Sequence, residues 1–304
     1  MGTCAASDRK EAITAFLGKH ITVEQAPIFG SIAAFQQGFG FPVLEINVTY
    51  MKLATAILAL SLAAPAIYAQ PAPVGGSAQP AANAVDPASI QALKDMGAHL
   101  QTLKRFQVST ELTGERVLAD GQKLQHTAAA DIDAERPNRL RARMFSARSK
   151  REIFYDGKTI TLWTPAQKYY STVGFVDTLG GLIDRLEEKY GVQLPMEDLF
   201  RWGTPAAPFD KIESAMNAGQ DFVGKDLCDH YAFRQGKIDW QIWITAGSKP
   251  LPRKVVITNR ADEARPQSVS LFDWNLNPSF PASVFKFTPP KGATKIEIVP
   301  LKTK

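Results

Sequence analysis

The chain is poor in cysteine and has no large excess of charge of either sign. Its 304 residues include only Cys4 and Cys228, which excludes the disulfide framework of small secreted domains and a structural zinc site of several thiolates. Lysine and arginine total 35 against 30 acidic residues, and so weak a basic excess argues against a nucleic-acid partner. A content of 45% hydrophobic and 21% charged residues is typical of a globular protein and excludes a disordered, collagen-like or polytopic membrane chain.

One long uncharged run breaks this composition, and it lies inside the chain. Residues 53–69, LATAILALSLAAPAIYA, follow Met51-Lys52 and end in small residues, as in a secretory signal peptide cleaved after Ala69. The alternative is a transmembrane anchor, but a bilayer span needs about 20 apolar residues and Pro65 interrupts the run. We therefore expect a signal peptide over residues 51–69 and export to the periplasm.

The segments on either side of this signal carry no pattern of a fold. Residues 1–50 have no capped helix or hairpin turn, so we expect a disordered upstream extension ahead of a native start at Met51. The alternative is a genuine cytoplasmic extension, which would turn the apolar run into an anchor. Residues 70–85 are uncharged and rich in proline, alanine and glycine, which predicts a flexible linker. Residues 86–304 remain as a single periplasmic domain.

The domain begins with a helix and continues as strands. Asp86-Pro87 is a helix N-cap followed by proline, and apolar residues then recur at three- and four-residue spacing, which predicts a helix over 87–103. From Phe106 the hydrophobic period changes to two, as in a half-buried strand. Residues 104–173 are predicted to form an antiparallel meander of about six strands, with turns at Asp120-Gly121, Arg136-Pro137-Asn138 and Asp156-Gly157.

A helical insert separates this meander from a second group of strands. Apolar residues from Leu179 to Tyr190 share one helical face, with Asp177 as the cap and Gly191 as the end signal. A short helix from Leu194-Pro195 and a further helical turn over 212–218 follow, and alternation resumes at Phe222. The predicted fold class is α+β: a large curled antiparallel sheet of about ten strands, an incomplete barrel covered on its concave side by the N-terminal helix and the insert.

Six stretches of the domain form a specific series of motifs, in the order ERPNRLRARM, REIFYDGKTITLWTPAQKYYST, EKYGVQLPMEDLFRWGT, VGKDLCDHYAFRQGKIDWQIWI, PLPRKVVITN and FKFTPPKGA. Together these motifs resemble a family of predicted bacterial periplasmic proteins of unknown function. That family is similar in turn to the lipoprotein-carrier superfamily (LolA- and LolB-like, LppX-like). The resemblance implies an incomplete barrel of about eleven strands, closed by helices, that holds acyl chains in a hydrophobic cavity. It assigns no residue of this chain to a carrier motif.

Catalytic motifs are scarce. Cys228 and His230 would share one face of a strand, but their Cα atoms would stand about 7 Å apart, which is poor geometry for a thiol and its base. The sequence has no Gly-x-Ser-x-Gly elbow, and its histidines lack metal-ligand spacing along a helix. We expect a protein that is not an enzyme and needs no metal or cofactor. A hydrolase assembled from residues distant in sequence is the remaining catalytic alternative.

Large apolar side chains and a stripe of arginines are the candidate binding residues. The stripe, Arg139, Arg141 and Arg143, either faces solvent or meets anionic lipid headgroups or an acidic protein partner. We predict an exported binding protein that holds a lipid, or the acyl chain of a lipoprotein, in the concave face; the alternative is a docking or sensor module for an envelope protein. The predicted lining residues are Phe106, Val108, Met144, Phe154, Trp163, Tyr170, Trp240 and Ile242.

Overall fold

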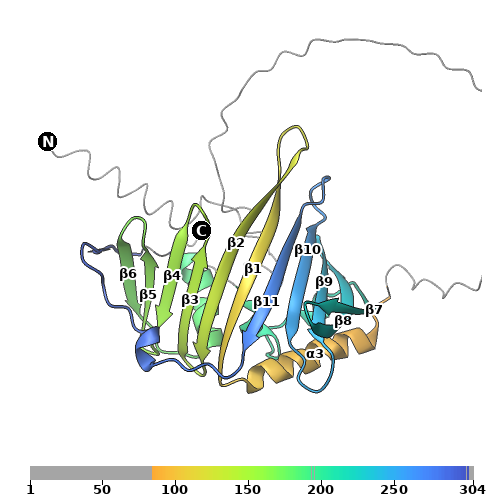
Figure 1. Cartoon of the computed structure of the whole chain (residues 1–304), viewed down its shortest axis with the longest axis horizontal. Coiled ribbons are helices and arrows are strands. Elements are labelled where there is room, and N and C mark those ends of the chain that lie inside the picture. The colour runs from red at the N-terminus through yellow and green to blue at the C-terminus, as the bar shows by residue number, and fades with distance from the viewer. Residues whose placement is uncertain (1–83, 193, 195, 299, 301–304) are drawn as a thin grey trace, which may run out of the picture.

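The computed structural model describes residues 84–192, 194, 196–298 and 300 (Figure 1). The predicted upstream extension, the signal peptide and all but two residues of the predicted linker lie outside the described residues. The described chain forms one sheet of twelve strands in the order β12-β6-β5-β4-β3-β2-β1-β11-β10-β9-β8-β7. The predicted α+β class is therefore confirmed.

The bounds of the elements follow the chain. The helices are α3 (Pro87–Thr102), α4 (Leu179–Tyr190) and α5 (Asp198–Arg201), with short 3-10 turns at Phe209–Lys211 and Ala282–Phe285. The strands are β1 (Arg105–Val117), β2 (Lys123–Glu135), β3 (Arg139–Phe145), β4 (Lys150–Tyr155), β5 (Thr159–Thr164), β6 (Tyr169–Gly174), β7 (Ser214–Val223), β8 (Asp226–Gln235), β9 (Ile238–Thr245), β10 (Pro252–Asn259), β11 (Gln267–Asn275) and β12 (Thr294–Lys295).

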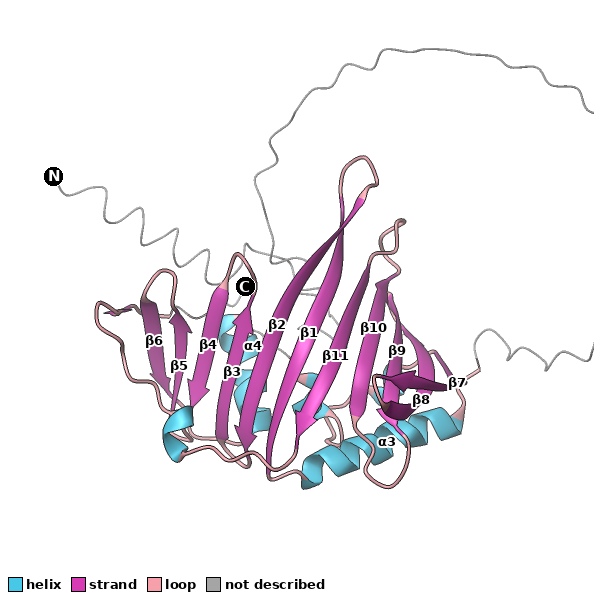
Figure 2. Cartoon of the chain, viewed as in Figure 1, coloured by secondary structure: helices cyan, strands magenta, loops and turns pink. Residues whose placement is uncertain are grey.

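The sheet consists of two antiparallel meanders joined at its centre. Strands β1 to β6 are neighbours in chain order, as predicted for residues 104–173, and β7 to β11 form the second meander. The two halves meet where β1 pairs with β11, and the short β12 pairs with β6 in parallel. Figure 2 shows the sheet bending toward the side on which the helices lie. We call the helix side the inner face and the opposite side the outer face.

Helix α3 begins as its sequence predicts and ends at Thr102, one residue early. The Asp86 carboxylate accepts hydrogen bonds from the backbone N–H groups of Ala88 at 3.1 Å and Ser89 at 3.0 Å, which satisfies two of the free donors at the helix start. Its buried apolar side chains, Leu93, Met96 and Leu100, pack into the core under the sheet. No helix among the described residues is long and apolar enough to cross a membrane.

Helix α4 has the predicted buried face and end but a different cap. Thr178, rather than Asp177, is the N-cap, because its hydroxyl oxygen accepts from the Gly181 N–H at 3.3 Å. The Asp177 carboxylate instead accepts from the N–H of Thr178 at 2.6 Å. Gly191 ends the helix in the left-handed conformation, with φ 61°, which glycine adopts without a steric cost.

The prediction of helix over residues 212–218 is wrong, because β7 begins at Ser214. This strand forms the edge of the sheet, and from Met216 to Phe222 its residues are exposed on both faces. A β-bulge between Asn217 and Gly219 also shifts its register against β8. The sequence of such a strand lacks the hydrophobic alternation that burial of one face would impose.

Both faces of the sheet bury side chains. The main core lies on the inner face, under α3, α4 and α5. Trp240 and Trp243 point to opposite faces: Trp240 belongs to the main core, and Trp243 packs with Cys228 and Val256 on the outer face. The segment after β11 brings Phe285 and Phe287 against the β3–β6 half of the sheet.

Candidate functional site: a cavity at one end of the sheet

Five of the eight predicted lining residues lie on the inner face. Phe106, Val108, Trp240 and Ile242 are at most 1% exposed and belong to the main core, and Met144 packs against its border. Their neighbours fill the space around them. The Trp240 ring stacks on Phe233 at 4.2 Å between centroids, for example. These residues therefore form a packed layer between sheet and helices.

The other three predicted lining residues do not join them. Phe154, Trp163 and Tyr170 surround the ring of Phe287, with centroid distances of 5.4, 5.5 and 5.1 Å. Strands β4 and β5 are buried on both faces from Glu152 and Ile160 onward, and in β4 the consecutive apolar residues Ile153, Phe154 and Tyr155 point to alternate faces. Alternation then does not indicate which side chains face the helices. The assignment of these three rings to the concave face is corrected accordingly.

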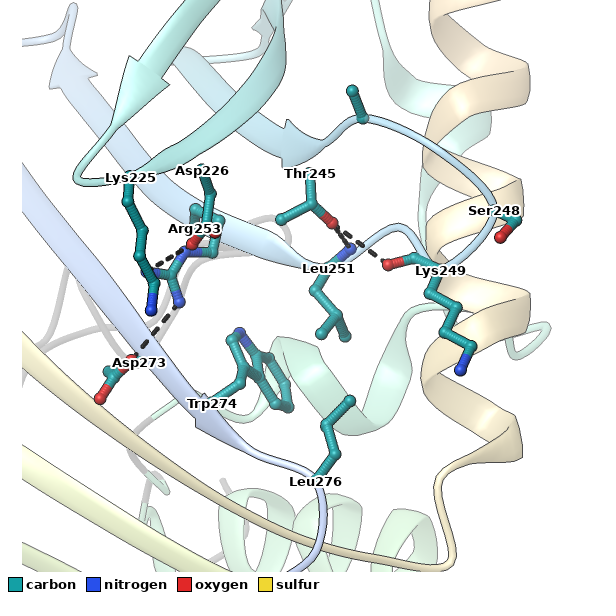
Figure 3. Close-up of a pocket in the computed structure, with 11 residues that line it drawn as sticks. Lys225, Asp226, Thr245, Ser248, Lys249, Leu251, Arg253, Asp273, Trp274 and Leu276 are labelled. Atoms are coloured by element: carbon teal, nitrogen blue, oxygen red, sulfur yellow. Dashed lines mark hydrogen bonds and ion pairs between the residues drawn. The ribbon is translucent and has the colours of Figure 1, made fainter.

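A cavity of about 500 Å³ lies at one end of the sheet, beside the main core (Figure 3). It forms where β8 and β10 begin, β9 and β11 end, and the β9–β10 loop passes over them. Its size is within the range of small-molecule sites. The cavity is lined by Lys225, Asp226, Thr245, Ala246, Ser248, Lys249, Leu251, Arg253, Asp273, Trp274 and Leu276.

The floor of the cavity is apolar and continues into the main core. It consists of Leu251, Trp274 and Leu276, all of which belong to the main core or pack against it. The Trp274 indole donates to the carbonyl of Pro252 at 2.8 Å, and its ring contacts Phe106 at 5.7 Å between centroids. The indole is therefore fixed in orientation while part of its ring lines the cavity.

The charged groups of the cavity are set by a β-bulge and a loop. The register of β10 against β9 shifts between Pro252 and Lys254, and bulges commonly redirect a side chain. Arg253, at this shift, makes ion pairs with Asp226 at 3.0 Å and with Asp273 at 3.6 Å. The Arg253 Nε is buried and has no hydrogen-bond acceptor among the described residues.

The β9–β10 loop is closed by the side chain of Thr245. Its hydroxyl donates to the carbonyl of Lys249 at 3.2 Å and accepts from the N–H of Leu251 at 2.9 Å, as the dashed lines in Figure 3 show. This arrangement holds Lys249 at the rim. No lining residue of the cavity was among the predicted site residues. The only sequence signal for it is a Gly-Ser-Lys-Pro loop after a strand, which is typical of any hairpin connection.

The predicted arginine stripe lies on the outer face and is paired with carboxylates. Arg139 contacts Glu135 at 3.0 Å and Arg141 contacts Glu152 at 2.8 Å. A terminal nitrogen of the Arg143 guanidinium lies 3.5 Å from a carboxylate oxygen of Asp131 and 3.5 Å from one of Asp133. The acids belong to the neighbouring strands β2 and β4, so the stripe is largely neutralised within the sheet. Its recognition of headgroups or of an envelope partner stays a prediction, and such recognition would have to compete with these pairs.

The candidate catalytic residues are occupied by other contacts. The Cys228 thiol donates to the backbone carbonyl of Asp226 at 3.5 Å, and burial raises the pKa of this thiol. The ring nitrogens of His230 lie 2.9 Å from the Gln241 amide oxygen and 3.4 Å from the Asp221 carboxylate. Neither nitrogen is therefore placed as a base for the thiol. Among the described residues, no group of three or more histidine, cysteine or acidic side chains could hold a metal ion.

Comparison with solved structures finds matches of low sequence identity that cover nearly the whole of the matched chains. LprF from Mycobacterium bovis is 13% identical, with a TM-score of 0.37 over 69% of this chain and 99% of its own. The Mycobacterium tuberculosis lipoprotein LppX is 10% identical, with a TM-score of 0.41 over 64% and 98%. A LolA superfamily protein from Nitrosomonas europaea is 10% identical, with a TM-score of 0.31 over 66% and 97%.

Comparison with protein families identifies one family whose match covers most of the chain. No curated protein matches the chain. The family described as "Predicted periplasmic protein (DUF2092)" matches residues 89–299, which run from the first turn of α3 to beyond β12. The resemblance seen in the sequence motifs is thereby confirmed. The chain belongs to this family of predicted periplasmic proteins.

Proposed function

We propose that this protein is an exported binding protein whose hydrophobic ligand, a lipid or the acyl chain of a lipoprotein, lies in the cavity at the end of the sheet. The observation that carries the proposal is the apolar floor of Leu251, Trp274 and Leu276, which extends the main core to an open site. An acyl chain on this floor would gain about 0.8 kcal/mol for each methylene group removed from water.

The proposed ligand site lies at the end of the core and not in the concave face that the sequence predicts. The inner face is occupied by side chains such as Trp240 and Phe106, which are at most 1% exposed. Opening a path between them would break close packing and cost several kcal/mol. The cavity, by contrast, already offers space next to apolar side chains. Binding there leaves the sheet and helices unchanged.

Filling the cavity with a bulky side chain should abolish uptake of a hydrophobic probe. Ala246 lines the cavity from the exposed β9–β10 loop, so Ala246→Trp can fill the space without disturbing the core. We expect the delipidated wild-type protein to bind a fluorescent acyl probe saturably. We expect Ala246→Trp to weaken this binding at least about tenfold, because the indole occupies the ligand's place.

The matched control is Ala261→Trp. Ala261 is also exposed, but it lies in the β10–β11 connection at the other end of the sheet. This variant should bind the probe as the wild type does, and both variants should unfold at the wild-type temperature. Equal probe binding by Ala246→Trp and Ala261→Trp would contradict the proposed site, and absence of saturable uptake by the wild type would contradict the function.

A further inference from the structure

We propose that the ligand carries an anionic head, a carboxylate or a phosphate, which the Arg253 guanidinium binds, while Lys225 and Lys249 attract its charge from the two sides of the apolar floor that holds its chain. This inference rests on the proposed function and adds the chemical class of the ligand. The inference is based on the division of the lining into a charged part and an apolar part. Three cationic side chains stand around the apolar side chains of Leu251, Trp274 and Leu276 (Figure 3).

Two of the three cations are free to bind. Lys225 comes from the β7–β8 turn and Lys249 from the β9–β10 loop, and Figure 3 shows them on opposite sides of the apolar floor. Neither ammonium group has an ion-pair or hydrogen-bond partner within the described part of the chain. Two free cations that flank an apolar surface favour a negatively charged amphiphile and disfavour a cationic one.

Arg253 supplies hydrogen-bond donors in a fixed orientation. Its side chain is only 16% exposed, and its guanidinium forms an ion pair with Asp226 at 3.0 Å. The second carboxylate, Asp273, lies 3.6 Å away and its side chain is 88% exposed, so this contact is weak and easily replaced. An anionic oxygen can take the place of Asp273 while Asp226 keeps the guanidinium in position. The planar guanidinium suits carboxylate and phosphate alike.

The terminal nitrogens of Arg253, which already meet Asp226 and Asp273, are the donors that an anionic head can reach. The Arg253 Nε is buried and takes no part in this contact. A carboxylate or phosphate head offers several charged oxygens to the terminal nitrogens. A neutral hydroxyl head offers a single oxygen without charge and gains less from all three cations.

The test compares ligands that share a chain and differ in the head. Dodecanoate, dodecyl phosphate and dodecanol compete with the fluorescent acyl probe at neutral pH for the wild-type protein and for the Lys225→Met/Lys249→Met variant. We expect both anions to bind the wild type about tenfold more tightly than the alcohol. The preference should fall severalfold in the double variant and at high salt, which screens exposed charges.

The control variant removes the same charge elsewhere. Lys237 and Lys286 are exposed and lie outside the cavity, and Lys237→Met/Lys286→Met should keep the wild-type preference. If the alcohol competes as well as both anions, the inference of an anionic head is contradicted while the proposed function stands. If none of the three amphiphiles competes and the probe itself does not bind, the proposed function fails. A preference for only one of the two anions supports the inference and identifies the head.

Discussion

Gly97→Ala should destabilise the protein, although alanine is the better helix former. Gly97 lies within α3, where alanine ordinarily stabilises a helix by about 0.5–1 kcal/mol. Here a methyl group would collide with the backbone N of Gly203 and lie 2.8 Å from its Cα. Because these contacts are with backbone, no side chain can turn aside. We expect a loss of about 1–3 kcal/mol in the free energy of unfolding, measured by urea denaturation.

The backbone of Gly203 approaches Gly97 closely at the point where the helical insert packs against α3. The carbonyl of Trp202 accepts a hydrogen bond from the Gln101 amide at 2.6 Å, and Gly203 has φ +79°, a conformation that favours glycine. The control is Gly180→Ala in α4, where the nearest atom to an added methyl group is the Thr178 hydroxyl at 3.9 Å. Gly180→Ala should be neutral or slightly stabilising. A neutral or stabilising Gly97→Ala would contradict this docking.

Glu197→Gln should remove a large part of the pH dependence of stability. The Glu197 side chain is 1% exposed, and this burial raises its pKa from 4.5 to about 7, although Arg201, 3.6 Å away, opposes the rise. The folded state therefore binds this proton more tightly than the unfolded state. The stabilisation is fully present below pH 4.5 and is lost as the pH rises through about 7. This difference corresponds to about 3 kcal/mol.

The comparison is made by urea denaturation at about pH 5 and about pH 8. The wild type should lose on the order of 2–3 kcal/mol more than Glu197→Gln over this interval, because glutamine does not ionise. The adjacent Asp198, whose pKa burial also raises, contributes in the same direction in both proteins. Glu188→Gln, on the exposed side of α4, should retain the wild-type pH dependence. Equal pH dependence of Glu197→Gln and the wild type would contradict the ionisation of a buried Glu197.

Much of the fold could be predicted from the sequence, because most of its strands have one face toward the core. Alternation from Phe106 and the turn at Asp156-Gly157 indicated β1 and the β4–β5 hairpin correctly. The edge strand β7 was missed because neither of its faces is buried over most of its length. The parallel pairing of β12 with β6 was missed because Thr294 and Lys295 form too short a strand to show a period.

The site was harder to predict than the fold, for two physical reasons. Strand alternation separates the two faces of a sheet but does not identify the face that the helices cover. Phe154, Trp163 and Tyr170 were therefore grouped with the inner residues, whereas they pack around Phe287 on the outer face. The cavity, in turn, is formed by the ends of four strands and a loop. Its residues come together through the register of the sheet, which no local pattern encodes.

Quenching of Trp274 fluorescence by a brominated acyl chain measures most directly where the bound ligand chain lies. Trp274 lines the cavity, whereas Trp240 lies in the packed core. We predict that the bound chain quenches the fluorescence of the wild-type protein. Trp274→Phe should remove most of this quenching while binding persists, whereas Trp240→Phe should leave the quenching unchanged. Quenching that survives in Trp274→Phe and disappears in Trp240→Phe would place the chain inside the sheet–helix layer and contradict the proposed site.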